Sequence, residues 1–109
     1  MKNIFKKYTP TSMFLAKYSE EEILKLLNES FELFKSKFNN HYGSIVEEDN
    51  LITISSGGWS DNEELISQFK STFWWLSYFK IHATGGHYFF DTNKNFTNNT
   101  KKWIVVKTE

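Results

Sequence analysis

The sequence predicts an α+β fold: a small single domain with the order α-β-β-α-β-β, in which an antiparallel sheet of about four strands carries two helices on one face. Apolar residues recur at helical spacing in two long segments, and four short runs rich in β-branched and aromatic residues stand in pairs. The 109 residues include 11 Phe, 5 Tyr and 4 Trp, enough apolar area for one aromatic core. We therefore expect residues 1–109 to form one domain, with residues 1–18 as an N-terminal arm packed on the body.

The N-terminal arm contains the only proline of the chain, Pro10. The residue before a proline avoids the helical region, so we expect residues 9–12 to form an extended or turn segment. Four apolar side chains should then pack the arm against the rest of the domain: Met13, Phe14, Leu15 and Tyr18.

A first helix is predicted to begin after Ser19, because Ser19 and Glu22 have the spacing of a capping box. Its apolar residues follow at spacings of four, four, three and four, which places them on one face: Ile23, Leu27, Phe31, Phe34 and Phe38. The helix should end near residues 39–40. The β-branched runs at 45–46 and 51–54 should then form a hairpin around the polar residues 47–50.

A second helix is predicted from residue 60, where Ser60 and Glu63 repeat the capping-box spacing. Its apolar residues continue at helical spacing to about Phe79, and residues 82–86 should form its C-cap and a turn. Residues 87–91 and 103–106 have the composition of strands, and the Asn- and Thr-rich residues 92–101 that of an exposed loop.

The composition excludes several classes of function. The chain has no cysteine, so disulfides, thiol catalysis and zinc–thiolate sites are absent. No stretch approaches the roughly 20 apolar residues of a membrane span, and the N-terminus lacks the apolar run of a signal peptide, so we expect a cytoplasmic protein without membrane contact. The 13 cationic residues are all Lys. Without Arg, the fork that recognises phosphate and guanine is missing, which argues against nucleic acid as a partner.

The formal net charge is zero, but the charges are segregated along the chain. Residues 19–50 carry eight acids against three Lys, whereas residues 1–18 carry four Lys and no acid. An acidic surface can meet a basic groove or imitate the charge of a nucleic acid. The candidate residues for this surface are Glu20, Glu21, Glu29, Glu32, Glu47, Glu48 and Asp49.

Two Gly-Gly pairs, at 57–58 and 85–86, bracket the second helix, and each is followed by an aromatic residue or a histidine. Glycine pairs can adopt backbone conformations that other residues avoid. We therefore expect both turns to be specific, and the aromatic and histidine side chains that follow them to lie close together. The candidates for contact with a ligand or partner are Trp59, Ser60, Asp61, Asn62, Glu63, His87 and Tyr88. Carboxylates near a histidine could bind a metal or transfer protons.

The same residues also have an interpretation without a ligand. The acids suit a helix N-terminus, the glycines a tight strand-to-helix turn, and His87 a hydrogen-bonded structural role if Phe89 faces the core. The three histidines lack metal-ligand spacing, so neither a metal nor a cofactor is predicted. The serines lack the Gly-x-Ser-x-Gly pattern, so a hydrolase is not supported. Whether the chain is an enzyme stays open, with a non-enzymatic role favoured.

The second helix also carries an aromatic cluster, Trp74, Trp75 and Tyr78. These rings could pack in the core, form a partner-binding patch, or stack on the bases of a single-stranded nucleic acid. The surrounding segment is net acidic, which disfavours the last of these.

The stretch from Ile54 to Ile66, with Ser-Gly-Gly-Trp-Ser-Asp-Asn-Glu at its centre, resembles a group of small phage and prophage proteins, as do Phe73-Trp74 and the run Gly85-Gly86-His87-Tyr88-Phe89-Phe90. The resemblance covers about residues 52–91 and implies an origin in mobile elements rather than an activity. Members of that group often carry Arg-Arg before the second Gly-Gly pair, where this chain has Ala83-Thr84.

Three functional hypotheses follow from these observations. The first is a non-enzymatic binding protein of a phage or mobile element that modulates a host protein in the bacterial cytoplasm, for example an anti-CRISPR protein; a homodimer is compatible with it. The second is a small-ligand or metal-binding domain with its site around Trp59–Glu63 and His87. The third is a weak nucleic-acid binder.

Overall fold

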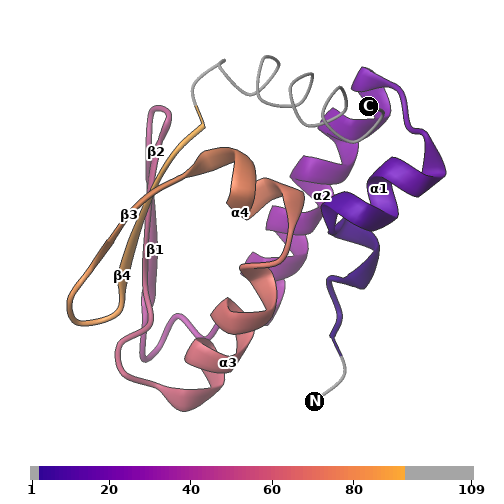
Figure 1. The fold of residues 1–109 in the computed structure, drawn as a ribbon. Helices are drawn as coiled ribbons and strands as arrows, with labels where there is room; N and C mark the ends of the chain where they lie inside the picture. Colours follow the sequence, from indigo (N-terminus) through magenta and orange to yellow (C-terminus); the bar gives the residue numbers. More distant parts are fainter. Residues whose placement is uncertain (1–2, 93–109) are drawn as a thin grey trace.

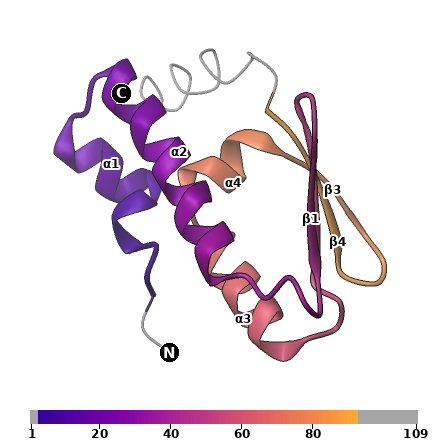
Figure 2. The ribbon, with the colours of Figure 1, turned by 180° about the vertical axis from the view of Figure 1, so that it is seen from behind.

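The computed structural model describes residues 3–92 of the chain. They form an α+β fold with a four-stranded antiparallel sheet, as predicted. The strands are β1 (Ser44–Glu48), β2 (Leu51–Ser55), β3 (Phe79–Ala83) and β4 (His87–Asp91), and their order in the sheet is β1-β2-β4-β3. All the helices of the described residues lie on one side of this sheet (Figure 1). The view from behind shows the same arrangement (Figure 2).

The helical layer contains a 3-10 helix, η1 (Lys6–Tyr8), and four α-helices: α1 (Pro10–Ala16), α2 (Glu20–Lys37), α3 (Ser60–Phe69) and α4 (Phe73–Tyr78). Helix α2 contacts η1 on one side and α3 and α4 on the other. It therefore forms the middle of the molecule, with the sheet and the N-terminal helices on opposite flanks (Figure 1).

Helix α2 confirms the sequence prediction in detail. Ser19 and Glu22 form the capping box: the Glu22 amide donates to the Ser19 hydroxyl at 3.2 Å, and the Ser19 amide to the Glu22 carboxylate at 3.0 Å. The bond from the Ser19 amide lowers the pKa of Glu22, since it favours the charged carboxylate. All five residues of the predicted apolar face are buried: Ile23, Leu27, Phe31, Phe34 and Phe38.

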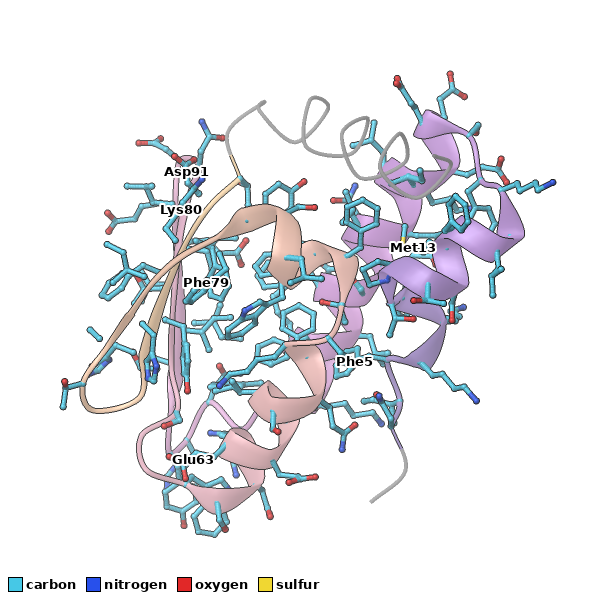
Figure 3. All side chains as sticks on the ribbon, in the orientation of Figure 1. Phe5, Met13, Glu63, Phe79, Lys80 and Asp91 are labelled. Carbon is cyan, nitrogen blue, oxygen red and sulfur yellow. The ribbon has the colours of Figure 1, made fainter. Side chains whose placement is uncertain are left out.

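The prediction for the N-terminal arm was partly wrong. Thr9 is extended, as expected before a proline, but Pro10 opens helix α1 instead of continuing an extended segment. Proline suits the first helical position because its missing N–H would have no partner there. Met13 is buried as expected and Leu15 is exposed, whereas Phe5 and Tyr8 enter the core without having been predicted to. Figure 3 shows Phe5 and Met13 among the side chains of the helical layer.

The prediction of one long second helix was wrong. Helix α3 ends at Phe69, and α4 begins at Phe73. Thr72 separates them: its buried hydroxyl donates to the Phe69 carbonyl at 2.7 Å and accepts from the Trp75 amide at 3.1 Å, so it caps a new helix. Residues 79–83 then form strand β3 instead of a helix end with its cap. The turn at 84–86 is consequently a hairpin turn between β3 and β4.

The fourth strand of the sheet is β3, which the sequence analysis did not predict. The predicted strand at 103–106 lies outside the described residues. One irregularity interrupts the pairing of β3 with β4: Phe79 lies opposite Phe90 and Ile81 opposite Phe89, so Lys80 is an extra residue in the edge strand. The extra residue turns Ile81 to the outer face of the sheet and His82 to the inner face, beside Tyr88.

The core lies between the inner face of the sheet and the helices, and it is built from stacked aromatic rings. Phe69 is at its centre, with its ring centroid 4.3 Å from that of Phe34 and 5.1 Å from those of Phe5 and Trp74. Trp75 meets Phe90 of β4 at 4.8 Å, which joins the helical layer to the sheet. Such ring pairs add about 0.5–1.5 kcal/mol each beyond their buried area.

Candidate functional site

The two Gly-Gly turns do come together, and Ser56 is where they meet. The Ser56 amide donates to the Gly86 carbonyl at 3.0 Å, and a side chain at Gly86 would overlap the Ser56 hydroxyl. Gly57 and Gly58 both have left-handed backbone, with φ of 69° and 72°. A side chain at Gly57 would overlap the Tyr42 carbonyl, whereas one at Gly58 would meet open space. Glycine is therefore required for close approach at two of these positions.

Asn62 is a structural clamp rather than an exposed ligand contact. It is 1% exposed, and its side chain joins two loops. Its Oδ1 accepts from the Asn39 amide at 2.9 Å, while its Nδ2 donates to the carbonyls of Asn39 at 3.0 Å and Ser56 at 3.3 Å. The end of α2 is thereby tied to the start of α3.

The second predicted capping box does not form. Helix α3 has Trp59 as its N-cap, without a side-chain bond, so Ser60 is already the first helical residue. Glu63 instead accepts a bond from the Ser56 hydroxyl at 3.4 Å, and that hydroxyl also accepts from the Gly58 amide at 3.2 Å. Figure 3 shows Glu63 at the end of the molecule where this turn lies. Ser60 and Asp61 remain exposed on the first turn of α3.

Trp59 lies against Tyr42 instead of the core. The two rings stack with centroids 4.4 Å apart, and His41 meets Tyr42 edge-on at 4.8 Å. The Trp59 Nε1 atom is buried and has no hydrogen-bond partner in the part of the chain that the structure describes. The ring pair closes the side of the first glycine turn.

His87 and Tyr88 point to opposite faces of the sheet. His87 is exposed on the outer face, where its Nδ1 lies 2.7 Å from the Ser55 hydroxyl. Tyr88 turns inward to Trp75, at 5.3 Å, and Phe90 rather than Phe89 enters the core. Between residues 3 and 92 no hydrogen bond or ion pair joins His87 to the segment Trp59–Glu63. The two glycine turns are therefore adjacent through their backbone, but the side chains of the predicted site residues do not converge.

The aromatic cluster predicted on the second helix is part of the core. Trp74, Trp75 and Tyr78 are 3%, 5% and 7% exposed. Trp74 stacks on Phe31 of α2 at 4.5 Å, and Trp75 on Phe79 of β3 at 5.3 Å. Burial raises the pKa of Tyr78 to about 12. Rings packed in this way offer no surface for stacking on bases.

One acidic residue of α2 and one of strand β1 meet at Lys35. Its Nζ atom lies 2.8 Å from Glu32 on the same helix and 3.4 Å from Glu47 on β1. The hydrogen bond with Glu32 is the main reason why the pKa of Lys35 is raised. Glu48 and Asp49 follow Glu47 and are exposed. We call Glu32, Glu47, Glu48 and Asp49 the acidic face.

The remaining predicted acidic residues lie elsewhere on α2. Glu20 and Glu21 occupy its first turn, about 18 Å along the axis from Glu32 at about 1.5 Å per residue. Glu29 is partly buried. Of the seven predicted acidic candidates, the structure therefore brings Glu32 and Glu47 together at Lys35, and Glu48 and Asp49 follow Glu47 in the chain.

A groove of about 810 Å³ opens beside the acidic face, between α2, α4 and the β1–β2 hairpin. Its floor is apolar and largely aromatic, formed by Phe31, Ile52, Trp74 and Tyr78. Polar and charged residues line its rim: Asn28, Glu32, Lys35, Glu47, Asn50 and Thr92, with Leu24 beside them. The sequence analysis did not identify this groove. Its one local signal is the spacing of Asn28, Glu32 and Lys35 on one side of a helix.

Neither a metal site nor a membrane segment is found in the described part of the chain. Residues 3–92 contain no group of three His, Asp or Glu side chains that could hold a metal ion. Their helices are also too short or too polar to cross a bilayer.

Comparisons with models of protein families, with curated proteins and with solved structures each find no match.

Proposed function

We propose that this chain is a small non-enzymatic binding protein of a phage or mobile element, and that its acidic face binds a basic surface on a host protein. Inhibition of a bacterial defence system, as by an anti-CRISPR protein, is the concrete form of this proposal. The observation that carries it is Lys35, which joins Glu32 of α2 and Glu47 of β1 into one acidic face beside an open groove.

The groove and the acidic face are complementary to a basic side chain of a partner. An Arg or Lys side chain could enter the groove with its stem along the apolar lining, while Glu32 and Glu47 at the rim would take its charge. Lys35 already occupies a place of this kind, with its Nζ atom 4.6 Å from the centre of the Phe31 ring. Exposed ion pairs contribute only about 0–1 kcal/mol, so an incoming cation can displace Lys35 at low cost.

The other two hypotheses have less support. The ligand or metal hypothesis needs Asn62 and Glu63 to be available. Asn62 is buried and bonded to Asn39 and Ser56, and Glu63 accepts from the Ser56 hydroxyl. The nucleic-acid hypothesis needs exposed rings, and Trp74 and Trp75 are buried.

The test is restoration of phage growth in bacteria whose CRISPR immunity blocks that phage. Expression of the wild-type chain should restore plaques. The triple variant Glu47→Gln, Glu48→Gln, Asp49→Asn should not, because it removes three charges while leaving side chains of nearly the same shape. The control variant Glu21→Gln, Asp61→Asn, Glu64→Gln removes as many exposed charges from other surfaces and should act as the wild type does.

A second measurement identifies the partner. The tagged wild-type chain should retain a host protein at low salt and release it as ionic strength rises, because the interface is charged. The proposal fails if no immune strain regains plaques and no host protein is retained in a manner that depends on residues 47–49. Equal behaviour of the triple variant and its control would also reject it.

A further inference from the structure

The outer face of the sheet is covered by no element of residues 3–92. Every described helix lies on the opposite side (Figures 1 and 2). One row of residues crosses the middle of this face through all four strands: Val46 on β1, Thr53 on β2, Phe89 on β4 and Ile81 on β3. Val46, Phe89 and Ile81 are 46%, 38% and 59% exposed. Three of these four residues are apolar and exposed, and we call the four together the apolar row; exposed apolar side chains grouped on one face are a feature of interaction surfaces.

The rows on either side of this apolar row differ in chemistry. Toward one end of the strands lie Glu48, Leu51 and Asp91, which are cross-strand neighbours. Toward the other end lie Ser44, Ser55, His87 and Ala83. The outer face therefore has an acidic side and a hydroxyl and imidazole side, separated by the apolar row.

We propose that this face binds a second copy of the same chain, with each strand stacked on its own copy in the opposite direction. The twofold axis then runs along the apolar row, so Val46, Phe89 and Ile81 meet their own copies. The same rotation places His87 opposite Asp91 of the partner subunit, and Ser44 opposite Glu48 of the partner subunit. If the strands of the two subunits instead ran in the same direction, the acidic rows of the two subunits would face each other.

His87 has a second ring nitrogen that suits this arrangement. Its Nδ1 lies 2.7 Å from the Ser55 hydroxyl. In the tautomer whose Nδ1 accepts from that hydroxyl, Nε2 carries the proton and can donate to a carboxylate on a facing sheet. Faces of two sheets pack about 10 Å apart, with side chains from both filling the space.

The size of the face sets the strength of the association. Strands of five residues at about 3.4 Å per residue, four abreast at about 4.8 Å, span roughly 17 by 19 Å. Stable interfaces bury about 800 Å² per partner, well above the roughly 320 Å² of this plan area. The dimer should accordingly be weak and visible only at high protein concentration.

The experiment is sedimentation velocity of the full chain over a wide range of concentration. The wild-type mass should rise from that of a monomer toward twice that value. Phe89→Lys and, separately, Ile81→Lys should each raise the dissociation constant at least tenfold. Leu15→Lys, at a residue 72% exposed on α1, is the matched control and should leave it unchanged. Circular dichroism confirms folding, and Thr53→Lys replaces any variant that does not fold.

Orientation is tested with Val46→Cys, which has the only thiol in a chain without cysteine. The proposed axis brings the two Val46 positions together, so a short thiol crosslinker should link the subunits. An axis along the strands would separate them by about three strand spacings, about 14 Å. Failure to crosslink would overturn this orientation.

Three results would overturn the dimer itself. The wild type could stay monomeric at every concentration, or Phe89→Lys could dimerise as the wild type does. The third is a monomeric wild type in which Phe89 is needed only for binding a different protein. The double variant Glu47→Gln, Asp49→Asn weakens the acidic face but keeps Glu48 on the outer face of the sheet, so it should dimerise as the wild type does. Failure of one proposal is therefore distinguishable from failure of the other.

Discussion

Replacing Asn62 with alanine should destabilise the protein by about 2–3 kcal/mol. The change removes three hydrogen bonds, at 2.9, 3.0 and 3.3 Å. The Asn39 amide loses its acceptor, and an orphaned donor of this kind costs about 1–3 kcal/mol. The two carbonyls lose less, because that of Asn39 still accepts from Gly43 and that of Ser56 from Trp59. The better helix propensity of alanine returns about 0.5 kcal/mol.

The assay is urea denaturation of Asn62→Ala beside Asn28→Ala, which removes the same side chain from an exposed position on α2. The control should lose no stability. Asn62→Asp is a sharper variant, since it turns a charged oxygen toward two carbonyl oxygens. Its introduced carboxyl should have a folded-state pKa above the ordinary value of about 3.9, so its folded state should be most favoured below pH 4 and weaken as pH rises toward 7.

Two results would refute the clamp role of Asn62. One is a loss in Asn62→Ala no larger than that in Asn28→Ala. The other is an Asn62→Asp variant equally stable at pH 4 and pH 7 relative to the wild type.

Three further predictions concern stability. Gly58→Ala should cost about 1 kcal/mol, because alanine is strained at its positive φ. Gly57→Ala should cost several times more, because its new side chain would also collide with the Tyr42 backbone. Thermal denaturation of the two variants checks this. Ser19→Ala should cost about 1 kcal/mol in chemical denaturation and Ser60→Ala nearly nothing, because only the first caps its helix; equal losses would contradict the observed caps. The pKa of Tyr78 is raised to about 12, so its contribution is complete below pH 10 and is lost as pH rises through 12. The wild type should therefore lose roughly 1–2 kcal/mol more than Tyr78→Phe over that range, after allowance for solvent screening, and parallel pH profiles would contradict it.

Local signals predicted the parts of the fold that depend on neighbouring residues. The capping box of Ser19 and the helical face from Ile23 to Phe38 are confirmed because each rests on contacts within one helix. Residues 73–78 are helical as predicted, but the break before them was missed because the apolar residues on both sides keep a helical spacing. The signal for the break is Thr72, a good N-cap in the middle of an apolar stretch.

The candidate site was harder to predict because it depends on tertiary contacts. Asn62 looked like an exposed residue of a helix start, and only its position beside Asn39, 23 residues away, makes it a clamp. The acidic face likewise depends on Lys35 reaching from α2 to Glu47, and the groove combines residues from three elements. The spacing of residues along the chain does not predict such tertiary contacts.

The extra residue in β3 has a consequence for how this molecule avoids aggregation. Lys80 interrupts the ladder in one edge strand, and Glu47 and Glu48 charge the other, β1. Figure 3 shows Lys80 near the end of the sheet that carries Asp91. Irregular and charged edges resist the addition of further strands, which is how open-ended fibres grow. Edges of this kind in the described sheet favour association through its faces over strand addition, and a twofold contact between faces closes after two copies.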